Sequence, residues 1–419
     1  MARYDSTNGS KVGSSLRLPC SVRHTFTIVV ASALIGAICG AVVATILTSG
    51  NETSREELDV VVGSAVDGAV EQAVDQAVDQ AMHQSTSELA AQLEDSANSQ
   101  RARIAGIYEQ ISQSVVIIDA EGPERTNDEG VVVIPAALAT GFVLDADGHI
   151  ITAAHVLEGM SRFMVILPTG ETLVAERLGD DIPFSDVAVL RIESDELQEE
   201  LVVPSFGSSV ALRAGETVVA FGNTILGKEI AISVGIVSDP DTTFFRERYE
   251  QDNLIQTDAA LNHGNSGGVL VDLDGDIVGM TAVIARETRD GEFVDGVGFA
   301  IQIDAVLEVA REIAENGFYP RPTFGVVNER LLTPTAAAQL DLEVTEGSFL
   351  IEIQRLGAFA RAGIRPGDVL RELNGIAINA DTPYLNALAT LEPNVPVIVH
   401  IHRGGEDYRL SVTPDLRAP

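Results

Sequence analysis

The middle of the chain, residues 106–318, is divided into short apolar runs by glycine, aspartate and proline. Runs such as QSVVIID, VAVLRI and TVVAFG are typical of β-strands, because they are rich in branched apolar residues and end at turn-forming ones. Three two-residue turn signals lie between such runs: Asp147-Gly148, Thr169-Gly170 and Asp274-Gly275. Pairs of this kind favour tight hairpins. Many short strands joined in this way predict closed, all-β barrels.

A different pattern follows the strand-rich region. The stretch Ala300–Phe318 has apolar residues at helical spacing and ends in an Asn-Gly pair, which predicts a helix. Arg321 and Pro322 then mark a linker, and roughly the last hundred residues mix strands with one helix near Pro383–Leu391. A chain of 419 residues is also too long for one ordinary core. We therefore expect a mainly β protein with a larger barrel domain and a smaller α+β domain.

The N-terminal part contains one long uncharged stretch, Thr25–Leu47. As a helix it spans about 35 Å, enough to cross a hydrocarbon layer about 30 Å thick. It is longer than the apolar part of a removable signal peptide, roughly 7–15 residues, so an uncleaved transmembrane signal anchor is favoured. Four basic residues precede it, whereas residues 51–100 carry eleven acidic residues and only Arg55. The positive-inside rule therefore predicts residues 1–24 in the cytoplasm and the bulk of the chain outside.

A helical spacer is expected after the anchor, at residues 51–105. Two overlapping capping-box patterns, Thr53-x-x-Glu56 and Ser54-x-x-Glu57, mark its start. An apolar pair, mostly alanine and valine, then recurs every four residues. Four helical residues turn the chain by about 400°, so this stripe drifts by about 40° per repeat and would favour right-handed winding if helices associate. The pattern is compatible with a solvated helical stalk and with a coiled coil.

Composition excludes one large class of partners. The sequence holds 62 acidic against 27 basic residues, a formal net charge of −35, and it has no tryptophan. Such a surface repels the phosphates of nucleic acids, and no aromatic platform for bases is visible. Both cysteines, Cys20 and Cys39, precede Gly40, so neither a disulfide nor a cysteine zinc site can form in the later domains. No metal or other cofactor is expected.

The segment ALNHGNSGGVLVD, residues 260–272, places Ser266 among glycines. Such a serine is either a nucleophile or part of a turn, and a nucleophile needs an imidazole base that a buried carboxylate orients. Most of the seven histidines are poorly placed for that task. They lie beside the anchor, in the spacer, in a hairpin turn, too near Ser266 or in the smaller domain: His24, His83, His149, His263, His400 and His402. His155, in IITAAHVLEGM, remains.

Asp186 is the matching carboxylate. It stands at the mouth of an apolar strand in PFSDVAVLRI, where an aspartate must be paired, whereas most other acidic residues lie in solvated runs. Taken singly, His155 could be a structural histidine, Asp186 a turn cap and Ser266 part of a bulge. Their order along the chain, His155, Asp186, Ser266, is that of the chymotrypsin-type proteases.

The motifs around these residues resemble one family. The runs TAAH, DVAVL and GNSGG, with longer ones such as ATGFVLDADGHIITAAHVLEG and LIQTDAALNHGNSGGVLVDLDGDIVGM, are similar to the HtrA (DegP/DegS) family of trypsin-like serine proteases. The resemblance covers residues 106–318 and implies two packed six-stranded β-barrels with the site in the cleft between them. It implies a serine endopeptidase in which Ser266 attacks, His155 is the base and then the acid, and Asp186 orients the ring.

The same resemblance suggests roles for the residues before the serine. The N–H groups of Gly264 and Ser266, with Asn265 between them, would form the oxyanion hole. Ala260 would lie at the base of the specificity pocket; since it is not an acid, a small apolar residue before the scissile bond is expected. His263 replaces the proline common in the family and is similar to the DegS-like branch. It is either a neutral exchange or a residue that lets the oxyanion loop switch between inactive and active forms.

The C-terminal unit, residues 322–416, resembles a PDZ domain on the runs TFGVVN and ARAGIRPGDVLRELNGIAI. PDZ domains bind a free C-terminus by adding it as a strand to a sheet edge. The resemblance implies that the N–H groups of Phe324, Gly325 and Val326 bind the terminal carboxylate. Thr323 and Phe324 depart from the usual Tyr-Leu or Tyr-Ile, which leaves the peptide preference open.

Together these features predict a membrane-anchored HtrA-type serine endoprotease in the inner (cytoplasmic) membrane, with its protease and PDZ domains in the periplasm. The resemblance implies a homotrimer that cleaves misfolded or regulatory envelope proteins and is regulated by C-terminal peptides. The narrower expectation is cleavage of an anti-sigma factor in an envelope stress response, and the broader one is protein quality control. The alternative is a catalytically silent, PDZ-bearing scaffold or chaperone-like binding protein.

Overall fold

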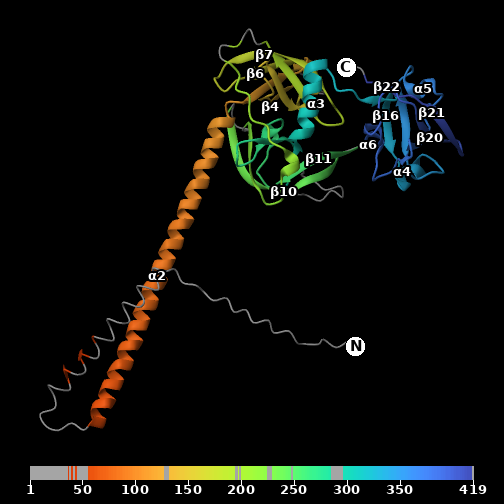
Figure 1. Ribbon diagram of the computed structural model, residues 1–419. Coiled ribbons are helices and arrows are strands. Elements are labelled where there is room, and N and C mark those ends of the chain that lie inside the picture. The colour runs from red at the N-terminus through yellow and green to blue at the C-terminus, as the bar shows by residue number, and fades with distance from the viewer. Residues whose placement is uncertain are drawn as a thin grey trace, which may run out of the picture. The chain divides into compact units, whose positions relative to one another are not determined.

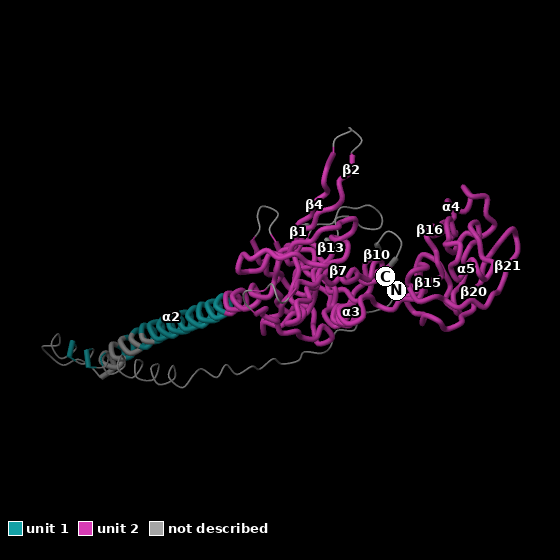
Figure 2. Tube along the Cα trace, turned by 90° about the horizontal axis from the view of Figure 1, so that it is seen from above, with its two compact units in different colours: residues 1–102 teal, residues 103–419 magenta. Residues whose placement is uncertain are grey.

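The computed structural model describes most of the chain from Arg55 onward. The described residues are 36, 39, 40, 43, 44, 55–126, 132–193, 197, 200–223, 229–246, 249–284 and 296–417. Contacts divide the chain into two units, Met1–Ala102 and Arg103–Pro419 (Figure 2). Within the described residues, no helix is both long enough and apolar enough to cross a membrane. The predicted anchor Thr25–Leu47 lies almost entirely outside them, so it stays a prediction.

One long helix, α2 (Arg55–Ile111), covers the region of the predicted spacer (Figure 1). In the first unit several of its described valines and leucines are exposed, and the coiled coil stays a prediction. The end of the helix behaves differently, because Ile107 and Ile111 are buried in a barrel core. Tyr108 also stacks on Phe221, with ring centroids 6.2 Å apart. The last turns of α2 are therefore part of the second unit's packing.

The first barrel closes six antiparallel strands. Their order is β1 (Val115–Glu121), β4 (Ala136–Val143), β5 (His149–Ala153), β8 (Val187–Ile192), β7 (Thr172–Asp180) and β6 (Arg162–Ile166). Two predicted turns join paired strands, Gly148 between β4 and β5 and Gly170 between β6 and β7. Their φ angles are +92° and +88°, which glycine adopts without strain. A two-stranded ribbon, β2 (Arg125–Thr126) and β3 (Val132–Val133), stands apart from the barrel sheet.

The second barrel has the same strand number. Its order is β10 (Ile230–Arg246), β11 (Tyr249–Thr257), β14 (Gly298–Gln302), β13 (Ile277–Ile284), β12 (Val269–Val271) and β9 (Thr217–Asn223). The third predicted turn, at Gly275, joins β12 and β13. Buried side chains of both barrels share one core cluster, for example Val187 and Val189 with Phe221 and Val269. The expectation of two packed six-stranded barrels is confirmed.

Helix α3 (Ile303–Asn316) follows the last barrel strand and is amphipathic. Its buried residues belong to the core cluster that the barrels share, and the helix contacts β7 and β8 of the first barrel and β13 and β14 of the second. It ends at Gly317, whose φ of +82° satisfies a left-handed C-cap. The predicted helix began at Ala300, but residues 300–302 complete β14, because their backbone pairs with β11 and β13.

The C-terminal part forms a separate sheet with three short helices. The sheet has the order β16 (Val326–Leu331), β17 (Ser348–Ile353), β18 (Val369–Leu373), β20 (Val397–Arg403) and β21 (Glu406–Val412), with β19 (Ile376–Ala377) on β18. A second pair joins β15 (Pro322–Thr323) to β22 (Asp415–Leu416). The helices are α4 (Pro334–Gln339), α5 (Ala358–Arg361) and α6 (Tyr384–Ala389). The sequence predicted only α6; the other two are six and four residues long, too short for a periodic pattern.

Candidate active site

Strand pairing brings His155 and Asp186 together. His155 lies in a short 3-10 helix, η1 (Ala154–Leu157), directly after β5, and Asp186 directly precedes β8. Strands β5 and β8 pair antiparallel, with Ala153 opposite Val187, so the two residues meet at the same end of the pair. The His155 Nδ1 atom is 2.7 Å from Asp186 Oδ2, and the His155 backbone N–H donates to Oδ1 at 2.8 Å. One carboxylate thus holds both the ring and the backbone of His155.

Asp186 is buried and held by hydrogen bonds of both its side chain and its backbone. Its residue is 2% exposed, and its φ of +57° lies in the left-handed region, which aspartate tolerates better than most residues. Its carbonyl accepts from Ala154 N–H at 2.9 Å. A buried carboxylate is stable only with hydrogen-bond donors, and His155 supplies two. The imidazole is therefore held with Nε2 away from the carboxylate, the geometry of a general base.

The Ser266 segment belongs to the second barrel but packs on the first. Thr140 N–H, on β4, donates to the Ser266 carbonyl at 3.1 Å. Gly267 has φ of +80°, and a Cβ there would lie 2.2 Å from the Thr140 carbonyl and 2.8 Å from Ala153 N. Only glycine fits this approach. The serine loop therefore lies against the strand end that carries His155.

The three predicted residues therefore lie at one junction between the barrels. Among the described residues, no hydrogen bond joins the Ser266 hydroxyl to the His155 ring. In enzymes without bound substrate such contacts are often long and tighten on binding.

The residues before Ser266 form a tight turn. His263–Asn265 is a 3-10 helix, η4, in which Asn265 N–H donates to the Asn262 carbonyl at 3.0 Å. The Gly264 N–H donates to Asn262 Oδ1 at 2.9 Å, and the Gly264 carbonyl accepts from Thr140 Oγ1 at 2.7 Å. The Gly264 N–H, predicted to bind the oxyanion, is thus already hydrogen-bonded to Asn262 in the same turn. The side chain of His263 lies outside the described part of the structure.

Ala260, the predicted pocket residue, lies between β11 and this turn. It is exposed, and its carbonyl accepts from Ser233 Oγ of β10 at 2.8 Å. Its side chain carries no charge, so nothing at this position would neutralise a bound arginine or lysine.

The predicted peptide-binding residues open strand β16. Phe324 is buried and stacks on Phe359, with ring centroids 4.4 Å apart, and Gly325 has φ of +79°. The Gly325 N–H donates to Thr323 Oγ1 at 3.1 Å. Val326 begins β16, which lies at one edge of its sheet. An edge strand offers unpaired N–H and C=O groups to an incoming peptide.

Sequence reasoning missed the buried threonines that connect the loops. Thr140 Oγ1 accepts from Asn223 N–H at 2.8 Å while it donates to Gly264, and Thr152 Oγ1 donates to the Thr140 carbonyl at 2.7 Å. Both threonines are fully buried. The available signal was their position inside apolar strands, where a hydroxyl must find partners.

These features define the class. Two closed antiparallel barrels, with a histidine–aspartate pair and a glycine-framed serine at their junction, are the architecture of chymotrypsin-type proteases. Residues 139–280 match the family model of the trypsin-like peptidase domain, and residues 333–413 match that of the PDZ domain.

Two curated relatives point to one group within the trypsin-like peptidases. The "Probable periplasmic serine endoprotease DegP-like" of Hahella chejuensis is 34% identical over 293 residues, which cover 70% of this chain and 58% of the relative. The protein of the same description from Halomonas elongata is 33% identical over 277 residues, covering 66% and 56%. The chain therefore spans a little more than half the length of these relatives.

Solved structures agree. The "HtrA-type protease AlgW with tripeptide" is 30% identical with a TM-score of 0.51, covering 75% of this chain and 97% of that one. The "HtrA-type protease AlgW with decapeptide" is 28% identical with a TM-score of 0.54, covering 75% and 99%. The chain belongs to the HtrA family of trypsin-like serine endoproteases with a C-terminal PDZ domain. These relatives do not single out the DegS-like branch.

Proposed function

We propose that this protein hydrolyses peptide bonds with Ser266 as nucleophile, His155 as base and Asp186 as the orienting carboxylate. The observation that carries the proposal is the 2.7 Å contact between the His155 ring and a carboxylate that is 2% exposed. The close approach of Gly267 to Ala153 supports it, because it brings the serine loop to the same strand end.

The chemistry follows from these roles. Ser266 Oγ bonds to the scissile carbonyl carbon while its proton passes to His155 Nε2. The C–N bond then breaks, and the same proton passes to the leaving amine. Water attacks the resulting ester, gives one proton to His155, and Ser266 regains that proton as the new carboxyl group leaves. One water is consumed for each peptide bond cleaved.

We infer that the oxyanion turn has two forms and that the described one is latent, because Asn262 occupies the Gly264 N–H. Reversal of the His263–Gly264 peptide would convert the present turn into a type II turn, whose third residue requires positive φ. Gly264 now lies outside that region, and glycine can enter it without strain. The reversed form would offer the Gly264 N–H to the oxyanion beside that of Ser266.

Peptide binding at the PDZ domain is the proposed regulator. Two structures of a similar protein are described with a tripeptide and a decapeptide. For this chain we propose that a C-terminal peptide adds to the free edge of β16, with its carboxylate at Phe324, Gly325 and Val326. Because Thr323 Oγ1 accepts from the Gly325 N–H, this hydroxyl has to turn away when the carboxylate binds.

We propose that the protein acts on the periplasmic side of the inner membrane. Two similar proteins are described as periplasmic, which supports this location. In this proposal the chain comprises the anchor Thr25–Leu47, the stalk 51–105, the protease domain 106–318 and the PDZ domain 322–416, and it forms a homotrimer. Cleavage of misfolded envelope proteins is the general form of this role. Cleavage of an anti-sigma factor in a stress response is its narrower, DegS-like form.

Fluorophosphonate labelling of the full-length protein tests the catalytic assignment. The wild type is expected to become labelled and Ser266→Ala to stay unlabelled; equal labelling of both would refute the role of Ser266. Failure of the folded wild type to label under any condition would favour the silent scaffold, with the occupied Gly264 N–H as its basis.

Casein cleavage with and without a hydrophobic C-terminal tripeptide separates the general protease from the DegS-like form, because strong unstimulated cleavage contradicts the DegS-like form.

A further inference from the structure

The loop between β7 and β8 carries Asp186 and wraps around one buried carboxylate, Asp181. Asp181 N–H donates to the Val187 carbonyl at 2.9 Å, and the Asp181 carbonyl accepts from Phe184 N–H at 2.8 Å. Ser185 Oγ donates to Asp181 Oδ2 at 2.7 Å. Ser185, directly before Asp186, is therefore bound to the Asp181 carboxylate, and Val187, directly after it, to the Asp181 backbone, so Asp186 lies between two residues that Asp181 holds.

The charge of Asp181 is balanced by Arg321. Arg321 Nε donates to Oδ1 at 2.9 Å and Nη2 to Oδ2 at 2.6 Å, a bidentate pair in which the Asp181 side chain is 0% exposed. The guanidinium also lies over the rings of Phe184 and Tyr319, 4.8 and 4.5 Å from their centroids. Burial has the largest single effect and lowers the pKa of Arg321, but the hydrogen bonds to Asp181 and the attraction of nearby negative charges, chiefly that of Asp181, together raise it.

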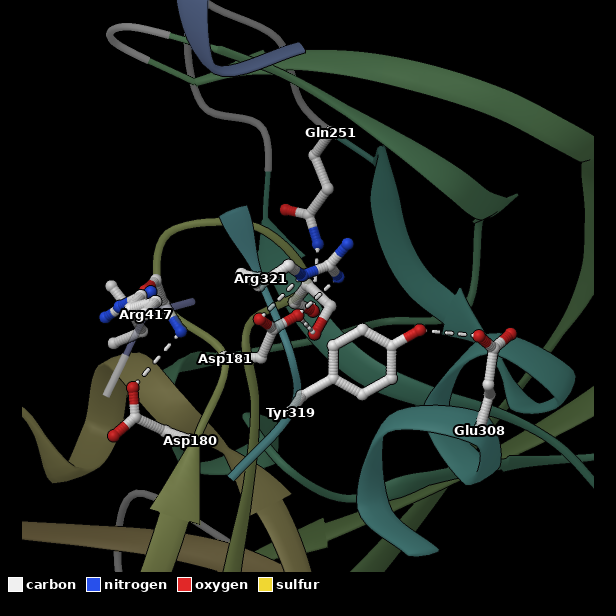
Figure 3. A network of polar contacts seen from close by, with 9 residues as sticks. Asp180, Asp181, Gln251, Glu308, Tyr319, Arg321 and Arg417 are labelled. Atoms are coloured by element: carbon white, nitrogen blue, oxygen red, sulfur yellow. Dashed lines mark hydrogen bonds and ion pairs between the residues drawn. The ribbon is translucent and has the colours of Figure 1, made fainter. Parts of the chain in front are cut away.

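Arg321 lies on the segment that joins α3 to the PDZ domain. Figure 3 shows its guanidinium facing Asp181, with Tyr319 beside them and Glu308 next to the Tyr319 hydroxyl. The Tyr319 hydroxyl donates to Glu308 Oε1 of α3 at 2.6 Å, so the linker is fixed on the protease side. The Arg321 carbonyl accepts from Arg417 N–H at 2.8 Å, so it is also fixed to the C-terminal end of the chain.

The same loop contacts the PDZ domain directly. Phe184 packs against the PDZ core cluster. Arg417 Nη1 donates to the Ile182 carbonyl, and Gln251 Nε2 on β11 approaches the Ser185 carbonyl at 3.5 Å. The loop of Asp186 is therefore held from the linker, the C-terminus and β11, and a displacement of the PDZ domain would remove two of these supports.

We propose that Arg321 is a positioning residue for the His155–Asp186 pair, through which the placement of the PDZ domain controls the catalytic base. This rests on the proposed function, since it assigns a regulator to that same site. It differs from control of the Gly264 turn, which acts on the oxyanion. Without Arg321, Asp181 is a buried charge with no cation, so the loop opens toward water and Asp186 no longer orients His155.

The PDZ domain supplies a matched control pair. Arg403 Nε and Nη2 donate to the two oxygens of Asp368, each at 2.5 Å, and the Asp368 side chain is 1% exposed. This pair has the same bidentate form and burial as Arg321–Asp181. It lies within the PDZ fold and contacts no residue of the loop 181–186 in the described structure.

The experiment measures fluorophosphonate labelling of the full-length protein as maximal rate and half-saturating concentration, from pH 5 to pH 9. For Arg321→Met we expect the maximal rate to fall about tenfold to a hundredfold with the half-saturating concentration nearly unchanged. The acid limb of the labelling rate, plotted against pH, should also move to lower pH, because the imidazolium of His155 loses its carboxylate partner. Arg321→Lys keeps the charge without the fork and should recover part of the rate.

Arg403→Met should lower thermal stability and leave both rate and acid limb at wild-type values. A folded Arg321→Met with wild-type rate and limb overturns the proposal, as does an Arg403→Met that shifts the limb equally. If Arg321→Met does not fold, Arg321→Lys decides: a wild-type rate and limb overturn the proposal. Labelling that persists in Ser266→Ala would instead refute the proposed function.

Discussion

His155 and Asp186 lie at the ends of two paired strands of the first barrel, whereas Ser266 and Gly264 lie on a turn of the second. The first pair is joined by two hydrogen bonds and by the β5–β8 register. The Gly264 N–H is bound by the side chain of Asn262, two residues away. The position of the proposed base is thus set by the barrel itself, whereas that of the proposed oxyanion donor is set by a single turn.

Moving the His155–Asp186 pair should therefore cost much more free energy than reversing the turn at Gly264. Changing the register of β5 and β8 would break a barrel core, whereas reversing the peptide unit before Gly264 removes its hydrogen bond to Asn262, which contributes about 0.5–1.5 kcal/mol. Control by a weakly bound peptide is therefore expected at the turn, while control of the base requires the loop around Asp181 to move.

The largest effect is expected from Asp186→Asn, which removes the charge that orients His155. Labelling or peptide cleavage should fall by about 10⁴-fold, the size seen for this change in chymotrypsin-type triads. Asp145→Asn is the control in the same barrel, because Asp145 Oδ2 lies 2.7 Å from His149 Nδ1 outside the site. Equal losses in the two variants would contradict the assignment of the pair.

Thr140→Val tests the contact between the first barrel and the serine turn of the second barrel. It removes the donor to the Gly264 carbonyl and the acceptor for Asn223 N–H, and should lower the free energy of unfolding by about 1–3 kcal/mol. The labelling rate should fall about tenfold or more, because the serine turn is displaced.

Thr257→Val is the control for Thr140→Val. Thr257 Oγ1 also donates to a carbonyl, that of Ile236 at 2.8 Å, and accepts from Ala259 N–H at 3.1 Å. Chemical denaturation should show a similar loss of stability with a nearly unchanged labelling rate. A rate loss as large as that of Thr140→Val would show that the effect is merely structural.

Asn262→Ala is expected to act in the opposite direction. It removes the oxygen that holds the Gly264 N–H, so the reversed turn becomes more populated and basal labelling should rise about fivefold, corresponding to about 1 kcal/mol. Asn379→Ala is the control, since Asn379 Oδ1 accepts from Asp381 and Thr382 N–H groups in a PDZ turn. A basal rate at or below that of the wild type would contradict the latent form.

The smallest effect concerns stability and not the site. Asp304, in the first turn of α3, accepts from Ser209 Oγ at 2.6 Å and from its N–H at 2.8 Å, and chiefly the hydroxyl bond lowers the pKa of Asp304. A lowered pKa stabilises the fold above the usual range of aspartate, and this contribution is lost as the pH falls through the lowered value. Asp304→Asn should flatten that acid dependence in thermal melts by about 1 kcal/mol or less. An equal shift in the pH profile of labelling would contradict the separation of scaffold and site.

Several elements could be predicted because their causes are local. Gly148, Gly170 and Gly275 lie in the expected turns, and the short apolar runs around them form strands of two closed barrels. The order of His155, Asp186 and Ser266 could be recognised because His155 and Asp186 lie at strand ends and Ser266 lies in a glycine-rich turn. Helices α4 and α5 were missed, since they are held by PDZ packing and not by a pattern of their own.

From the sequence, short apolar runs and turn residues predicted closed barrels, the family resemblance predicted two six-stranded barrels and a PDZ domain, and residue order led to the proposed site of His155, Asp186 and Ser266. The tertiary structure decided which groups are occupied: the Gly264 N–H by Asn262, the Gly325 N–H by Thr323, and the Asp181 carboxylate by Arg321. Asp181 and Arg321 lie 140 positions apart. Hydrogen-bond partners depend on distances of a few tenths of an ångström, and only the folded chain sets those distances.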